Sequence, residues 1–357
     1  MASEEHKAGG GGGRLRQILP LVGTVLLVGY MVRSTDLDAV GAAFAGADLT
    51  ALLLTFVLGT AATWLADTGC LRWLVQRTLP LAAGATDRLG FRSLAGLKAA
   101  SYVLNIVNYN AATLGMGWVV AKRRGVGFAR GAAALAVLSW LDLVALAALV
   151  TVGMAAAPDL LGQDARLQAS LRGLTLVIPL GAVAVVAVAR MRERLPLVAQ
   201  LAKEPEPGAS GLRRLAHRLA VLVLDALAPL AALTAPAIAF GVLLRAGFVM
   251  LYVAVNFALM RAFGMQPDLG ELLVLIPVMT VVGVVPLSVS GIGTTQLLAR
   301  SLYARYVPVG IAAAPVIDAY TTALIFGFML TRLLVAAPFL PSIGAELRQA
   351  EVPTEAG

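Results

Sequence analysis

The sequence predicts an all-α fold: a polytopic membrane protein with about six full spans plus two re-entrant or broken helices in an inverted repeat. Its 357 residues are 59% hydrophobic and 13% charged, and their mean hydropathy is +0.85. Several apolar runs exceed the roughly 20 residues that a helix needs to cross a bilayer. Two further apolar runs contain polar, glycine-bearing breaks at matching positions, and this match indicates a repeat.

The predicted spans follow the apolar runs along the chain. A long apolar run with few charges is typical of a transmembrane helix. The full spans are expected near residues 15–33, 50–72, 131–156, 171–190, 232–262 and 311–338. Two more apolar segments, 94–121 and 270–300, carry the breaks.

These segments are predicted to form a single membrane domain. The glycine-rich start of the chain favours a flexible tail ahead of the first span. The predicted parts are a disordered tail 1–13, a membrane domain 14–340 with repeat cores at about 94–156 and 270–338 and a cytoplasmic loop 190–230, and a cytoplasmic tail 341–357.

The basic residues predict the topology, because cytoplasmic loops of membrane proteins carry an excess of lysine and arginine. Arg92 lies before the segment 94–121, and Lys122 and Arg123 follow it, so both of its ends are expected in the cytoplasm. Three full spans separate it from the segment 270–300, which must then enter from the opposite face. This interpretation places both termini in the cytoplasm and the protein in the plasma membrane.

The two breaks contain the residues that best match a binding site. Gly115 and Gly117 correspond to Gly291 and Gly293 at an offset of 176 positions (291 − 115 = 176). Unwound backbone is tolerated at membrane depth only inside protein or beside a water-filled cavity, and paired breaks indicate a transporter's binding site. Close helix packing at small residues is the alternative for the glycines. The predicted substrate-binding residues of the breaks are Asn105, Asn108, Asn110, Gly115, Gly117, Ser290, Gly291, Gly293 and Gln296.

Three charged residues lie inside apolar runs, where an ionised side chain is costly and usually has a partner or a function. Arg245 is predicted to bind the headgroup of an anionic substrate, because a guanidinium matches a phosphate with two donors. The alternative is an ion pair with Asp142 or Asp318. Those two aspartates, also related by the repeat, are predicted to couple protons or ions, with capping of free backbone N–H groups as the alternative. Asp67, close to Arg72, is expected at the membrane interface.

Other classes of site have weaker support. A single cysteine, Cys70, and two histidines form no cluster of metal ligands, so neither a metal nor a cofactor is expected. The net charge is +8, but the basic residues lie beside apolar runs, which favours a role in topology over nucleic-acid binding. Asp36 and Asp38 are similar to the acidic pair with which membrane glycosyltransferases hold a metal and a lipid-linked sugar. An ordinary acidic outer loop is the alternative.

The second break carries a Pro-x-x-x-x-Gly-Ile-Gly element that runs from Pro286 to Gly293. Together with the two glycine-bearing breaks and the basic stretch after the first, it makes the chain resemble the lysylphosphatidylglycerol synthase transmembrane-region family over about residues 15–340. Members of this family are also called flippase-like membrane proteins. The chain departs from the family pattern at Gln296, where a glutamate is usual. In the first break, Asn110-Ala111 stands where proline is common, and Gly115-Met116 stands where Gly-Glu is common.

The resemblance implies a lipid flippase-like transporter that moves or binds an anionic lipid, either a phospholipid or a polyprenyl-phosphate carrier, across the plasma membrane. No soluble aminoacyl-transferase domain follows the last span, so the chain is not expected to be an enzyme. The expected partner is an anionic membrane lipid, and a homo-oligomer or a partner membrane enzyme is left open. The alternatives are a membrane glycosyltransferase that acts on a lipid-linked donor at Asp36 and Asp38, and a non-transporting subunit that assists a partner enzyme.

Overall fold

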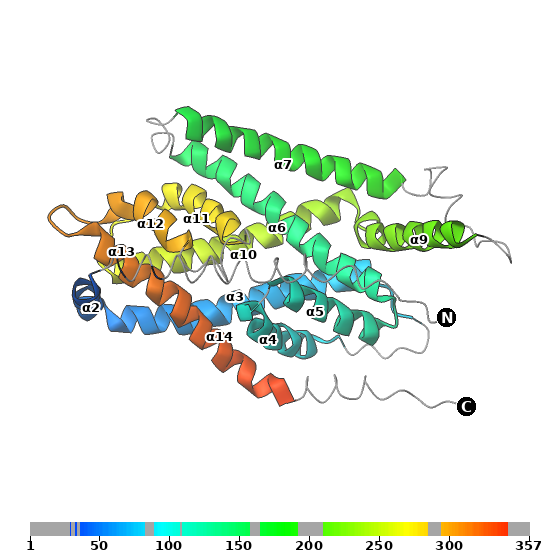
Figure 1. The fold of residues 1–357 in the computed structure, drawn as a ribbon, viewed down its shortest axis with the longest axis horizontal. Coiled ribbons are helices and arrows are strands. Elements are labelled where there is room, and N and C mark those ends of the chain that lie inside the picture. The colour runs from blue at the N-terminus through cyan, green and yellow to red at the C-terminus, as the bar shows by residue number, and fades with distance from the viewer. Residues whose placement is uncertain are drawn as a thin grey trace, which may run out of the picture.

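The computed structural model describes residues 36–82, 89–107, 109–157, 165–191, 210–284 and 294–341, together with Gly29 and Arg33. Within these ranges every regular element is a helix and none is a strand (Figure 1). The all-α prediction is therefore confirmed. The main helices are α2 (Leu37–Ala45), α3 (Leu49–Thr78), α4 (Phe91–Val107), α5 (Tyr109–Arg124), α6 (Phe128–Ala156), α7 (Ala165–Met191), α9 (Gly211–Ala231), α10 (Ala235–Ala262), α11 (Leu269–Val284), α12 (Thr294–Tyr303), α13 (Ala313–Thr322) and α14 (Phe328–Ala336).

Four helices among the described residues are long and apolar enough to cross a membrane: Leu49–Thr78, Phe128–Ala156, Ala235–Ala262 and Ala313–Phe339. They match four of the six predicted full spans. The last one is continuous because a wide helical turn over Ala323–Gly327 joins α13 to α14. The predicted span 171–190 lies within α7, whose described apolar part is Thr175–Met191. The predicted span 15–33 lies outside the described residues, except for Gly29 and Arg33.

Helices α3 and α10 run side by side, and α6 and α14 cross the bundle obliquely (Figure 1). Two large groups of buried apolar side chains form most of the core. One group lies among α10, α11 and α13 and includes Leu259, Ile276 and Ile317. The other lies among α3, α4 and α6 and includes Leu74 and Leu94. Helices α3, α6 and α10 therefore connect two packed regions, each of which contains one of the predicted breaks.

The first broken segment is an antiparallel helical hairpin made of α4 and α5. At its base, Arg123 Nη1 donates a hydrogen bond of 2.5 Å to Ser93 Oγ. Halfway toward its tip, Leu104 Cδ1 lies 3.8 Å from where a Cβ atom on Gly115 would be. Both contacts join a residue of α4 to a residue of α5, so the two helices pack against each other as the arms of a hairpin.

The second broken segment has the same design in α11 and α12. The backbone N–H of Gln266 donates a hydrogen bond of 2.7 Å to the Tyr306 carbonyl. Tyr306 in turn donates its hydroxyl to Glu271 Oε2 at 2.5 Å. These contacts close the base of a second hairpin, in which α11 and α12 pack together. The turn between its arms, residues 285–293, lies outside the described residues.

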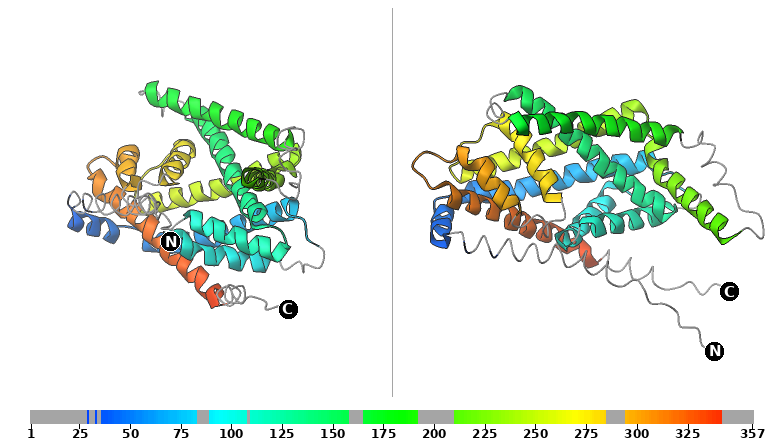
Figure 2. Two further views of the ribbon diagram at one scale, coloured as in Figure 1. Left: turned by 45° about the vertical axis from the view of Figure 1, so that its right-hand side comes forward. Right: turned by 45° about the horizontal axis from the view of Figure 1, so that its top comes forward.

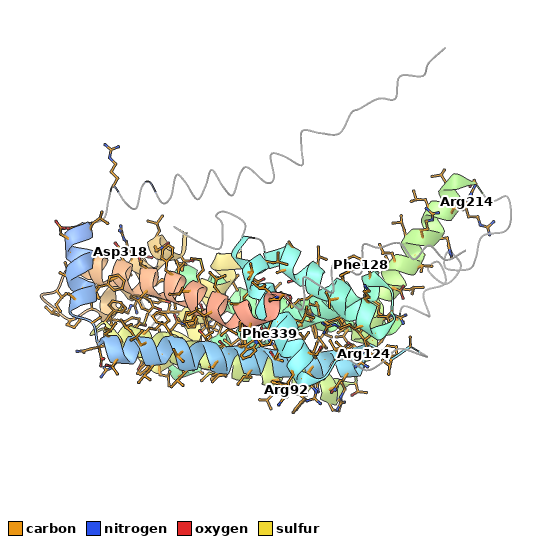
Figure 3. The ribbon with its side chains drawn as sticks, turned by 90° about the horizontal axis from the view of Figure 1, so that it is seen from below. Arg92, Arg124, Phe128, Arg214, Asp318 and Phe339 are labelled. Atoms are coloured by element: carbon orange, nitrogen blue, oxygen red, sulfur yellow. The ribbon has the colours of Figure 1, made fainter. Side chains whose placement is uncertain are left out.

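The two hairpins open at opposite ends of the bundle. Helix α3 marks both ends: the backbone N–H of Asp48, just before it, bonds the Ala262 carbonyl, and that of Ala82, just after it, bonds the Arg124 carbonyl. The base of the first hairpin lies at the Arg124 end, and the base of the second lies beside Ala262. Figure 3 shows Arg124 toward one end and Asp318 toward the other. The inverted arrangement of the two halves is therefore present in the fold.

Helix α9 lies within the predicted cytoplasmic loop and extends away from the Arg124 end of the bundle (Figures 2 and 3). Its first residue follows Ser210, whose side chain accepts a hydrogen bond from the backbone of Arg213, a typical N-cap. An ion pair of 2.8 Å between Arg130 and Asp225 fastens α9 to α6. Near its free end, Leu212 and Leu215 are exposed.

Candidate functional site

Four charged side chains meet inside the bundle, and each comes from a different helix. Lys98 Nζ of α4 lies 2.6 Å from Asp67 Oδ2 of α3. Arg245 Nη1 of α10 lies 2.6 Å from the other oxygen of Asp67, and Arg245 Nε donates a hydrogen bond to Asp142 of α6. We call Asp67, Lys98, Asp142 and Arg245 the four-charge cluster. It brings together residues as far as 178 positions apart.

The four-charge cluster is electrically balanced. Asp67, Lys98 and Arg245 are 6%, 8% and 4% exposed, and burial of an unpaired ion at such sites would cost several kcal/mol. Two carboxylates against two cations offset much of that cost, and Asp67 uses both oxygens to bridge Lys98 and Arg245. The Phe248 ring, 4.3 Å from the guanidinium carbon of Arg245, adds a cation–π contact. The cluster therefore holds α3, α4, α6 and α10 in register.

These contacts show which partners the charged residues Arg245, Asp142 and Asp67 have. Arg245 forms the ion pair with Asp142 that the sequence left open, and adds a second one with Asp67. Its direct contact with a headgroup stays a prediction. Asp142 binds Arg245, and capping of free backbone N–H groups in the first break stays a prediction for Asp142. Asp67, which was expected at the membrane interface, has its side chain buried within the four-charge cluster.

The second half holds a smaller charged pair. Arg300 of α12 donates from Nε to Asp318 Oδ1 at 2.7 Å and from Nη2 to Asp318 Oδ2 at 2.5 Å. This two-point geometry is the strongest that arginine and a carboxylate form. Gln296, one turn before Arg300, is 4% exposed. A role of Asp142 or Asp318 in proton or ion coupling stays a prediction, and the structure supplies each with an arginine partner.

The polar residues of the first break lie along the hairpin. Asn105 is half-buried, and its Oδ1 atom is buried with no hydrogen-bond partner among the described residues. Asn108 lies outside the described residues, and Asn110 belongs to α5 by its backbone, while its side chain is not described. A methyl group on Gly117 would lie 2.8 Å from Ala132 Cα of α6. Gly117 thus serves the close helix packing that was the alternative for these glycines, whereas Gly115 has more space.

The second break is only partly visible. Ser290, Gly291 and Gly293 lie outside the described residues, so their predicted roles in substrate binding stay predictions. Gln296 is described in the first turn of α12, which begins at Thr294. The polar stretch of the second break therefore leads directly into a helix, as it does in the first half, where α5 begins at Tyr109.

Two residues near the four-charge cluster are absent from the sequence-based set. Tyr102 follows Lys98 by one turn of α4 and is 6% exposed. Arg332 of α14 lies with its guanidinium carbon 5.2 Å from the Tyr102 ring centroid and 5.6 Å from that of Phe328. The sequence does contain a feature that could have identified Arg332, because this arginine lies within the apolar run 311–338, where a charged residue is costly.

Asp36 and Asp38, the acidic pair of the glycosyltransferase alternative, have a structural role at the start of α2. Asp36 Oδ1 accepts a hydrogen bond of 3.0 Å from the backbone of Ala39 and caps α2, and Asp38 lies in the first turn of that helix. Both positions suit carboxylates, because they lie near the positive end of a helix. Within the described residues, no group of three or more histidine, cysteine, aspartate or glutamate side chains could hold a metal ion.

The sequence matches the family described as the lysylphosphatidylglycerol synthase TM region over residues 17–334. This range covers both hairpins, the four-charge cluster, three of the four described helices that are long enough to span a membrane, and most of the fourth, Ala313–Phe339. The chain belongs to this family. A comparison with curated proteins gives no match. The resemblance seen in the two breaks is confirmed, and the chain is a multi-pass membrane protein of a family linked to lipids.

Proposed function

We propose that this member of the lysylphosphatidylglycerol synthase TM family is a lipid flippase-like transporter rather than an enzyme. It binds an anionic lipid, a phospholipid or a polyprenyl-phosphate carrier, and moves it across the plasma membrane. The observation that carries the proposal is the pair of opposed hairpins, whose bases lie at opposite ends of α3. Inverted elements of this kind build midplane sites in many transporters.

The hairpins support this function if each is re-entrant, with its tip inside the bilayer. Helix α5 begins at Tyr109 within the first break, and α12 begins at Thr294 directly after the glycines of the second, so each has its partially positive N-terminal end at a break. Two such ends favour the phosphate of an anionic lipid over a neutral headgroup. The basic Arg124 end then faces the cytoplasm, together with both termini.

Lipid movement by the purified protein tests the proposal directly. We would reconstitute it in vesicles that contain phosphatidylglycerol with a fluorescent acyl chain and add a membrane-impermeant quencher outside. We expect vesicles with protein to lose more fluorescence than empty vesicles, because lipid from the inner leaflet reaches the outer one. A fluorescent phosphatidylcholine serves as the control for headgroup preference. Equal quenching with and without protein would contradict the transport function.

Cysteine labelling tests the re-entrant arrangement. The exposed positions Gly90 and Lys122 flank the first hairpin, and Gln266 lies at the base of the second. In intact cells, we expect Gln266→Cys to react with an impermeant thiol reagent applied outside, and Gly90→Cys and Lys122→Cys to react only after lysis. The native Cys70 is 4% exposed, so the unaltered chain is the control. External labelling at position 122 would refute the predicted topology.

A further inference from the structure

Arg332 differs from the other cations that lie within the apolar part of the bundle. Lys98, Arg245 and Arg300 each contact a carboxylate at 2.6 Å or less. For Arg332, the part of the chain that the structure describes supplies neither an ion pair nor a hydrogen bond, only the faces of two aromatic rings. Its side chain is half-buried and therefore accessible. A cation without a carboxylate in such a place indicates a functional site.

Contacts with α3 place Arg332 far from both ends of the bundle. The adjacent Thr331 shares a hydrogen bond of 2.7 Å with Thr60. Thr60 lies within the 30-residue helix Leu49–Thr78, about 17 Å from its first residue and about 27 Å from its last at 1.5 Å per residue. Since the hydrocarbon core of a bilayer is about 30 Å thick, an arginine at this level lies deep within the membrane.

Two further polar groups of α4 have no hydrogen-bond partner among the described residues. The hydroxyl of Tyr102, whose ring contacts Arg332, is one of them. About one turn further along α4, the buried Asn105 Oδ1 is the other. The neighbouring four-charge cluster has no net charge, so it offers Arg332 no excess of negative charge. These groups supply a charged donor, a hydroxyl donor and an amide, which together suit a phosphate and a hydroxyl of a lipid headgroup.

We propose that Arg332 and Tyr102 bind the phosphate group of an anionic lipid at mid-depth, where α14 packs against α4 of the first hairpin. The inference deepens the proposed function, because a phosphate that crosses the membrane needs a cation partway along its route. Two carboxylates already hold Arg245 inside the bundle. Among the arginines that the structure describes within membrane-length helices, Arg332 has donors that are available to a headgroup.

Lipid binding tests this assignment separately from transport. Native mass spectrometry of the full chain in detergent, titrated with phosphatidylglycerol and with phosphatidylcholine, gives the affinity for each. We expect the wild type to prefer phosphatidylglycerol and Arg332→Gln to bind it about tenfold more weakly, the size expected for a hydrogen-bonded charge. Arg332→Lys should lose less, because it keeps the charge. Arg261→Gln removes a charge from an exposed position in the last turn of α10 and should leave the preference unchanged.

Tyr102→Phe is the second variant, because it keeps the aromatic ring under Arg332 and removes only the hydroxyl. We expect phosphatidylglycerol binding to weaken about threefold, and this result carries the test if Arg332→Gln does not fold. Soluble glycerol 3-phosphate should displace the lipid poorly, since the site lies deep in the membrane. Effective displacement by it would show a site for free phosphate and overturn the lipid assignment.

Two results would overturn the role of Arg332: no preference of the wild type for phosphatidylglycerol, or an unchanged preference in a well-folded Arg332→Gln. If Arg332 has a purely structural role, Arg332→Gln should keep the lipid preference but melt at a lower temperature. Arg332→Lys should then melt at the temperature of the wild type. Binding that depends on Arg332 without any lipid movement in vesicles would leave this inference standing and refute the transport function.

Discussion

The two halves of the bundle use the same repeated residues differently. Arg300 and Asp318 are 18 positions apart, and Arg124 and Asp142 have the same spacing in the first half. In the second half these two side chains form an ion pair. In the first half Asp142 binds Arg245 of α10 instead, while Arg124 is buried at the hairpin base, where its carbonyl accepts from Ala82.

The difference shows that a repeat can keep its charged residues and change their partners. The pair in the second half is local and connects a hairpin arm to the helix that follows it. The four-charge cluster in the first half connects four helices and has little exposure, apart from the Asp142 side chain at 25%. We infer that the first half depends on its charges for assembly more than the second half does.

The largest loss of stability is expected when one carboxylate is removed from a half of the bundle, and this change tests whether the first half depends more on its charges. Asp67→Asn leaves Lys98 and Arg245 with Asp142 alone, and we expect it to lower the free energy of unfolding by about 3–5 kcal/mol. Asp318→Asn should cost less, because the Arg300 side chain is 19% exposed and can reach solvent or headgroups. Thermal unfolding in detergent with size-exclusion profiles measures both. A larger loss for Asp318→Asn would reverse the comparison.

A double variant sharpens the assignment of Arg245. Arg245→Gln strands Asp142 and leaves Asp67 with Lys98, so we expect poor folding. Adding Asp142→Asn removes the stranded charge and should recover about 1–3 kcal/mol, the usual coupling energy of contacting residues. Melting temperatures of the two single variants and the double variant give this value. A well-folded Arg245→Gln that has lost its preference for anionic lipid would instead support the predicted headgroup contact.

The last prediction concerns the stability effect of the two glycines of the first break. The sequence predicts the same role for both of them. Gly117→Ala would place a methyl group 2.8 Å from Ala132 Cα, whereas Gly115→Ala would meet only Leu104 at 3.8 Å. We expect Gly117→Ala to destabilise the protein by about 1–3 kcal/mol, since backbone atoms of α6 would have to move. Gly115→Ala is the matched control and should change the melting temperature little. Equal effects of both would argue against close packing of α5 on α6.

The sequence by itself determined the membrane class, four of the described spans, both hairpins and their opposite orientation in the bundle. Each follows from local properties, namely apolar length, glycine in the breaks and the count of spans between them. It also limited the partner of Arg245 to a short set that included Asp142. It placed Asp67 at the interface, because the nearby Arg72 suggested a helix end, whereas α3 continues to Thr78.

Only the tertiary structure decided which charges meet. Asp67 and Arg245 are 178 positions apart, and their contact depends on how α3 and α10 rotate about their own axes as they pack. The same rotations leave Arg332 against aromatic rings and bury Gly117 on α6. Apolar runs with little periodicity carry no signal for such rotations, because a helix surrounded by lipid and protein is apolar on every side. Partner choice inside a membrane bundle is therefore set by side-chain packing between helices, which the pattern along one helix does not contain.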